Sequence, residues 1–114
     1  MIDTPDPFGL ARFYRDLLDG EIVAQSATSC DVRIPSGMTL AFQLAPDLRR
    51  PTWPDPEVPI QMHLDFLVDD YEEAQDRALR LGAILLEDET RHSWYRVYAD
   101  PTGHVFCLCL RDRS

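Results

Sequence analysis

The sequence predicts an α+β fold of two βαβββ modules in a pseudo-twofold arrangement, with the first strand shortened. The first observation is a repeat: an apolar helical stripe ends at Gly20 and leads to Ile22, and the same pattern returns with Gly82 and Ile84. The second observation is that short strand-like segments follow each helix in the same order. A repeated unit of this size cannot bury its apolar face alone, so the two copies should lean on each other.

The chain of 114 residues is long enough for one hydrophobic core. We therefore expect a single domain over residues 1–114. It divides into module one (1–46), a Pro-rich connector (47–59) and module two (60–111).

Module one begins with little room for a strand, since only Met1 to Asp3 are available to match the first strand of module two. Asp6 suits the N-cap, Pro7 suits the first helical position, and Gly20 suits the C-terminal stop. Three strands are predicted after it, with Pro35-Ser36-Gly37 as the turn between the last two. Their expected ranges are Glu21–Gln25, Cys30–Ile34 and Met38–Leu44.

Module two follows the connector, in which residues 46–59 hold five prolines. The segment 60–68 alternates apolar and polar residues, which indicates a strand with one face turned to a helix. Asp69 or Asp70 can start the second helix, and Gly82 can end it. Three further strands are expected, at Ile84–Glu87, Trp94–Tyr98 and Val105–Leu110, with the last two joined by the turn from Asp100 to Gly103.

The charge pattern excludes several classes of partner. The net charge is −9, all eleven basic residues are arginines, and no basic cluster is present. Nucleic acid and anionic membranes both require a positive surface, so neither is an expected partner. The absence of lysine excludes Schiff-base chemistry. Three cysteines without Cys-x-x-Cys spacing fit a reducing compartment, and no signal or membrane-length segment is apparent, so we expect a cytoplasmic protein.

Five residues are candidates for a ligand site. Gln43, His63 and Cys107 each lie on the strand face opposite large apolar residues, and in paired βαβββ sheets such faces look into one cleft. Trp94 and Arg96 would stand near its wall. Each residue also has a structural interpretation: His63 as a hydrogen-bonded histidine on a half-wet sheet, Cys107 as a buried inert thiol, and Arg96 as part of an exposed strand face.

The chain resembles the vicinal oxygen chelate superfamily, and more narrowly the small bacterial glyoxalase-like and bleomycin-resistance-like proteins. The matching segments are Asp6-Pro7-Phe8-Gly9-Leu10-Ala11-Arg12-Phe13-Tyr14, Leu40-Ala41-Phe42-Gln43, Trp53-Pro54-Asp55-Pro56, His63-Leu64-Asp65-Phe66-Leu67-Val68-Asp69-Asp70, Ala99-Asp100-Pro101-Thr102-Gly103-His104 and Phe106-Cys107-Leu108-Cys109.

The resemblance implies a homodimer and a small-molecule site between the modules. In metal-dependent members, first and last strands supply the ligands, so a divalent metal would use His63 and Gln43 here. Cys107 stands where the final glutamate would be, and the opening ligand of module one would fall before Met1. We therefore predict no cofactor, and binding of a small organic molecule with the reaction unassigned. The alternatives are a metal-dependent lyase, isomerase or dioxygenase, and a non-catalytic interaction domain.

Overall fold

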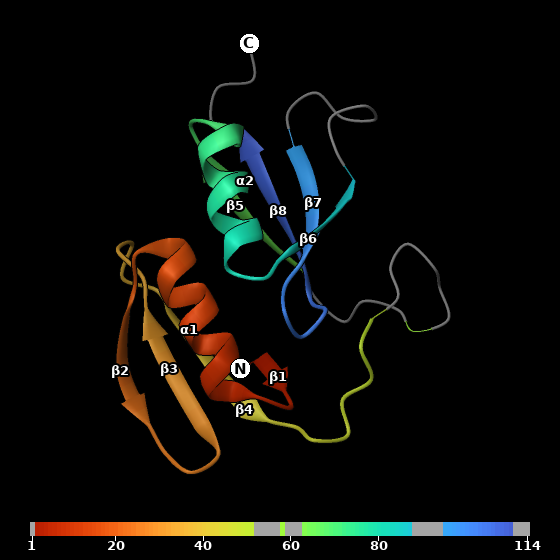
Figure 1. Cartoon of the computed structure of the whole chain (residues 1–114). Helices are drawn as coiled ribbons and strands as arrows, with labels where there is room; N and C mark the ends of the chain where they lie inside the picture. The colour runs from red at the N-terminus through yellow and green to blue at the C-terminus, as the bar shows by residue number, and fades with distance from the viewer. Residues whose placement is uncertain (1, 52–57, 59–62, 88–94, 111–114) are drawn as a thin grey trace. The chain divides into compact units, whose positions relative to one another are not determined.

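The computed structural model describes residues 2–51, 58, 63–87 and 95–110 (Figure 1). The chain divides into two compact units, Met1–Arg49 (unit 1) and Arg50–Ser114 (unit 2). Each unit contains one helix and one four-stranded sheet, so the predicted α+β fold of two modules is confirmed. Neither helix in the described ranges has the length and apolar character that a membrane crossing requires.

Unit 1 has the strand order β1-β4-β3-β2, with β1 parallel to β4 and the other pairs antiparallel. Its first strand has only three residues, which confirms the predicted shortening. The described part of the Pro-rich connector, residues 47–51 and 58, forms no helix or strand. The elements of unit 1 are β1 (Ile2–Thr4), α1 (Pro7–Leu18), β2 (Glu21–Gln25), β3 (Ser29–Arg33) and β4 (Thr39–Leu44).

Unit 2 repeats this topology with the order β5-β8-β7-β6, and β5 again runs parallel to β8. Residues 60–62 and 94, which we predicted to begin two of its strands, lie outside the described residues. The elements of unit 2 are β5 (His63–Val68), α2 (Tyr71–Arg80), β6 (Ile84–Glu87), β7 (Tyr95–Ala99) and β8 (Val105–Leu110).

The helix ends follow the capping signals, with one difference. The Asp6 carboxylate accepts the Gly9 N–H at 3.0 Å, as its predicted role as N-cap requires. At the other end of α1 the left-handed residue is Asp19 (φ 56°), where we expected Gly20. Gly20 serves another purpose, because a Cβ there would lie 2.9 Å from the Arg33 carbonyl oxygen. The helix therefore ends close against β3.

In each unit the helix packs on one face of its sheet. Tyr14 of α1 stacks on Phe42 of β4, with ring centroids 5.6 Å apart, and both rings are buried. The equivalent core of unit 2 contains Tyr98 stacked on Phe106 at 5.3 Å, and Tyr98 also donates a hydrogen bond to Gln75 of α2. Because side chains alternate along a strand, the neighbours of Phe42 and Phe106 turn to the opposite face, where the candidate residues were predicted.

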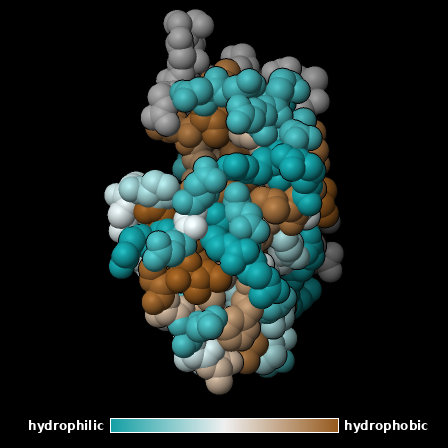
Figure 2. All heavy atoms as spheres, turned by 60° about the vertical axis from the view of Figure 1, so that its left-hand side comes forward, coloured by the Kyte–Doolittle hydropathy of each residue, from teal (hydrophilic) through white to brown (hydrophobic). Residues whose placement is uncertain are grey.

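The face of the molecule in Figure 2 is largely hydrophilic, with smaller brown apolar patches between the polar side chains. This agrees with the many charged residues of the sequence. Large hydrophobic residues do remain exposed among those described, and they are Val23, Met38, Leu44, Leu67, Leu79, Ile84 and Leu85.

Candidate functional site

The sheet of unit 2 presents a distinct face on the side away from α2, which we call the thiol face. Its centre is a buried cluster of Val97, Val105, Cys107 and Cys109, with Leu86 and Tyr95 packed against it. The strand register sets this composition, because Cys107 is the partner of Val97 on β7 and of Asp65 on β5. Apolar side chains therefore form the middle of the face, and polar groups stand at its β5 edge.

Asp65 and Cys107 interact directly on this face. Burial, as the largest cause, together with the charge of Asp65 and a hydrogen bond to its carboxylate, raises the pKa of the Cys107 thiol from 9.0 to about 12. Only 8% of Cys107 is exposed. The thiol is therefore protonated at neutral pH and can donate to Asp65, which makes it a poor nucleophile.

His63 lies beside this pair, on the same strand as Asp65. Its Nε2 lies 3.7 Å from Asp65 Oδ1, and about half of each side chain is exposed. The two residues are two positions apart on β5, so they point to the same side of the sheet. The structure thus brings His63 and Cys107, both predicted site residues, to one cluster with Asp65 between them.

A second carboxylate lies across the same row. Glu87 of β6 is the register partner of Val97, and its charge contributes to the raised pKa of Cys107. Asp65 and Glu87 were not among the predicted site residues. The signal for Asp65 was present, since it shares the polar face of the alternating strand with His63. For Glu87 no local signal existed, because its approach to Cys107 depends on the pairing of β6 with β7.

The donor groups of the thiol face do not fit a divalent metal. No group of three His, Cys, Asp or Glu residues in the described ranges is arranged to hold a metal ion. Cys107 stands at the position where the family resemblance places a carboxylate ligand, and its thiol is hydrogen-bonded to Asp65. A thiol is not the oxygen ligand that Mg²⁺ or Mn²⁺ prefers.

Gln43 lies in unit 1, on the face of the first sheet that is turned away from α1. It is the register partner of Asp3 on β1 and of Ser29 on β3, and it is exposed. Asp3 occupies in this sheet the place that Asp65 occupies beside Cys107 in the other. The expectation that Gln43 and His63 face one cleft concerns both units together and stays a prediction.

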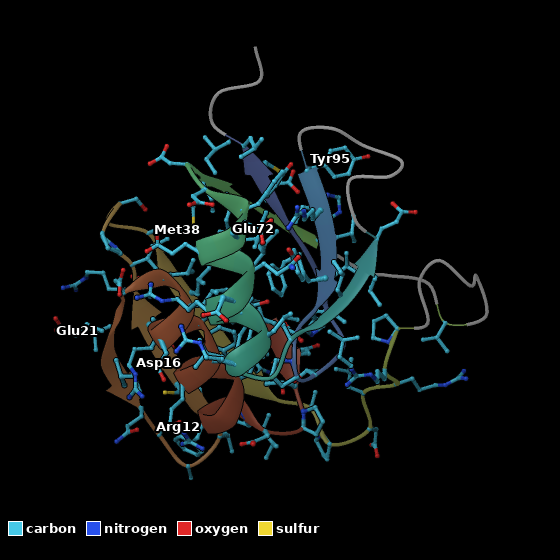
Figure 3. All side chains as sticks on the ribbon, turned by 45° about the horizontal axis from the view of Figure 1, so that its top comes forward. Arg12, Asp16, Glu21, Met38, Glu72 and Tyr95 are labelled. Atoms are coloured by element: carbon cyan, nitrogen blue, oxygen red, sulfur yellow. The ribbon has the colours of Figure 1, made fainter. Side chains whose placement is uncertain are left out.

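Arg96 lies on the side of the second sheet that faces α2. We had expected it on the opposite side, the thiol face, near Cys107. It is 6% exposed, and its guanidinium stacks on the Tyr71 ring at 4.4 Å. Nη1 donates to Gln75 Oε1 at 3.1 Å, and Nη2 lies 3.4 Å from Glu72 Oε1 (Glu72 is labelled on α2 in Figure 3). These contacts join β7 to α2. Trp94, the other predicted wall residue, lies outside the described residues.

Tyr98 shares the helix side with Arg96. Its hydroxyl donates to Gln75 Oε1 at 2.8 Å, and burial raises the pKa of Tyr98 to about 12. Gln75 therefore accepts from two donors at once. Arg96, Tyr98 and Gln75 form a partly buried polar contact between sheet and helix, which is costly to break because Arg96 and Tyr98 are buried.

Comparison with known proteins identifies the family. The model of the glyoxalase-like domain matches residues 1–109. The chain belongs to the glyoxalase-like family. Its predicted place in the vicinal oxygen chelate superfamily is thereby confirmed, and the paired modules are those of the glyoxalase/bleomycin resistance fold.

Solved structures of similar fold come from several bacteria. A glyoxalase/bleomycin resistance protein/dioxygenase family enzyme from Burkholderia phytofirmans PsJN has a TM-score of 0.73 at 21% identity, over 96% of this chain and 93% of that one. A glyoxalase-related enzyme from Fulvimarina pelagi has a TM-score of 0.68 at 23% identity, and the match covers 96% of this chain and 84% of that one. The fosfomycin resistance protein FosX from Mesorhizobium loti has a TM-score of 0.73 at 18% identity, and the match covers 98% of this chain and 88% of that one. Comparison with curated proteins gave no match.

Proposed function

We propose that this glyoxalase-like protein binds a small organic molecule, with Asp65, His63 and Cys107 of the thiol face in contact with it. The observation that supports the proposal is the cluster itself. A carboxylate and an imidazole stand half-exposed beside a buried thiol and two valines, so polar groups and an apolar surface adjoin. Ligand sites commonly combine an apolar lining with a few polar groups that fix orientation.

The charge of the cluster favours one kind of ligand. Asp65 and Glu87 are both acidic and lie in the same row, while Arg96 is held on the opposite face of the sheet. A ligand with a cationic or hydrogen-bond-donating group would be attracted, and a ligand with a carboxylate or phosphonate would be repelled. We therefore propose an organic amine or a neutral donor-rich molecule as the ligand class.

A ligand-observed NMR screen tests this directly. The library should contain matched organic amines, neutral amides and alcohols, and carboxylates and phosphonates, fosfomycin included. We expect amines and neutral donors to dominate the hits, and Asp65→Asn to weaken them about tenfold or more, as loss of a charge-assisted hydrogen bond does. Asp76→Asn, which removes an exposed carboxylate paired with Arg80, should leave the hits unchanged.

Two outcomes would contradict the proposal. Hits that bind Asp65→Asn and His63→Gln as well as the unchanged protein would place the ligand elsewhere. A preference for phosphonates would contradict the charge argument. Elemental analysis of the purified protein addresses the metal-dependent alternative, since about one tightly held metal ion per chain, lost in His63→Ala, would favour metal-assisted chemistry.

A further inference from the structure

The turn between β7 and β8 is held by several hydrogen bonds within the turn. The Asp100 carboxylate is fully buried and accepts three backbone N–H groups, from Thr102 at 2.9 Å, Gly103 at 2.9 Å and His104 at 3.0 Å. The backbone of Asp100 also accepts from Gly103 and donates to His104. A turn with this many internal hydrogen bonds offers a rigid surface to whatever packs on it.

Arg50 packs on this turn although it lies far away in the sequence. Its Nη1 donates to the Pro101 carbonyl oxygen at 2.9 Å. Its aliphatic stem crosses Gly103 so closely that a Cβ on Gly103 would collide with Arg50 Cγ. Gly103 also has a φ of 101°, which favours glycine. The turn therefore provides an acceptor for the guanidinium, and its glycine leaves space for the aliphatic stem of Arg50.

We propose that Arg50 and the β7–β8 turn form a clasp, which straps the beginning of the Pro-rich connector to unit 2. Arg50 is the first residue of unit 2, and the chain reaches β5 only at His63. The clasp thus fixes the chain to unit 2 well before the sheet of that unit begins. A protease can therefore reach the peptide bonds beside Arg50 only after the guanidinium has been released from Pro101.

The test compares two glycines with nearly the same φ. Gly37 has a φ of 96° and nothing within 4 Å of an added Cβ, whereas Gly103 has Arg50 there. Gly37→Ala and Gly103→Ala therefore carry similar left-handed strain, and only the second displaces Arg50. The readout is the initial rate of trypsin cleavage after Arg49 in the full chain, identified by mass spectrometry, because exposed and locally open segments are cut fastest.

We expect Gly103→Ala to raise this rate about fivefold or more, and Gly37→Ala to change it less than about twofold, since local opening controls the cleavage. Arg50→Ala leaves the turn unstrained and should raise the rate similarly, after normalisation to synthetic peptides of residues 45–55 with the same substitution. Equal rates in Gly37→Ala and Gly103→Ala, or no increase in Arg50→Ala, would overturn the clasp. Far-UV circular dichroism confirms that each variant is folded.

Discussion

Replacement of Arg96 by Met should destabilise the protein because it removes a buried guanidinium and keeps the apolar stem. The hydrogen bond to Gln75 joins a buried charged donor to a partly buried acceptor, and hydrogen bonds to charged groups contribute about 1.5–3 kcal/mol. The stack on Tyr71 contributes about 1 kcal/mol. Glu72 adds little, because its side chain is 81% exposed and exposed ion pairs contribute about 0–1 kcal/mol.

Two features reduce the total. Gln75 Oε1 keeps the Tyr98 hydroxyl as a donor, so it is not left without a hydrogen bond in the variant. Methionine also fills much of the volume of the arginine stem. The free energy of unfolding should therefore fall by about 2–3 kcal/mol, which is a large share of the stability of a domain of this size.

Urea denaturation at neutral pH measures this change. Arg80→Met is the matched control, because Arg80 pairs with Asp76 across one helical turn and both side chains are about 70% exposed. The control should cost less than about 0.5 kcal/mol. If Arg96→Met were no more destabilising than Arg80→Met, the contacts would not hold α2 to the sheet, and the predicted ligand role of Arg96 would become the better interpretation.

Four further outcomes are expected. The pKa of Tyr98 is raised to about 12 in the folded state, so its contribution to stability is complete below pH 10 and is lost as the pH rises toward 12. Across that range the urea midpoint of Tyr98→Phe should therefore decline less steeply than that of the unchanged protein. Asp65→Asn should lower the pKa of Cys107 and speed its alkylation by iodoacetamide at pH 8–9, measured by mass spectrometry, whereas an unchanged rate would show that burial alone protects the thiol. Phe13→Ala should lower the free energy of unfolding by about 3–5 kcal/mol, since Phe13 is buried in the core of unit 1; a melting temperature within a degree or two of the parent would contradict this assignment. Light scattering should give a homodimer, and a particle of 13.1 kDa at tens of micromolar would exclude it.

The alternation of apolar and polar residues was enough to predict the strands and their two faces, because a period of two is a local property of the chain. It predicted that Cys107 turns away from Phe106 and that His63 turns away from Phe66, and the structure agrees. The helix starts at Asp6 and Asp70 were equally local, since a capping side chain bonds to its own next turn.

The position of Arg96 was not accessible in the same way. Alternation along β7 places Arg96 and Tyr98 on one face of the strand, but which face meets the helix depends on the register between β7 and β8. A shift by one residue would exchange the faces. The partner that explains the burial, Gln75, lies on α2 and is recognisable only after the helix is packed on the sheet.

The two modules show how one backbone can present two kinds of surface. Asp3 pairs with Gln43 as Asp65 pairs with Cys107, so an aspartate stands at the same edge of both sheets. Its neighbour is an exposed amide in unit 1 and a buried thiol in unit 2. An amide offers both a donor and an acceptor to water or a ligand, whereas the thiol donates only to its own aspartate. The hydrogen bonds to a ligand at the second sheet would therefore come from Asp65, His63 and Glu87 rather than from Cys107. Asp65→Asn is the decisive substitution for the proposed function, because Asp65 contacts both His63 and Cys107.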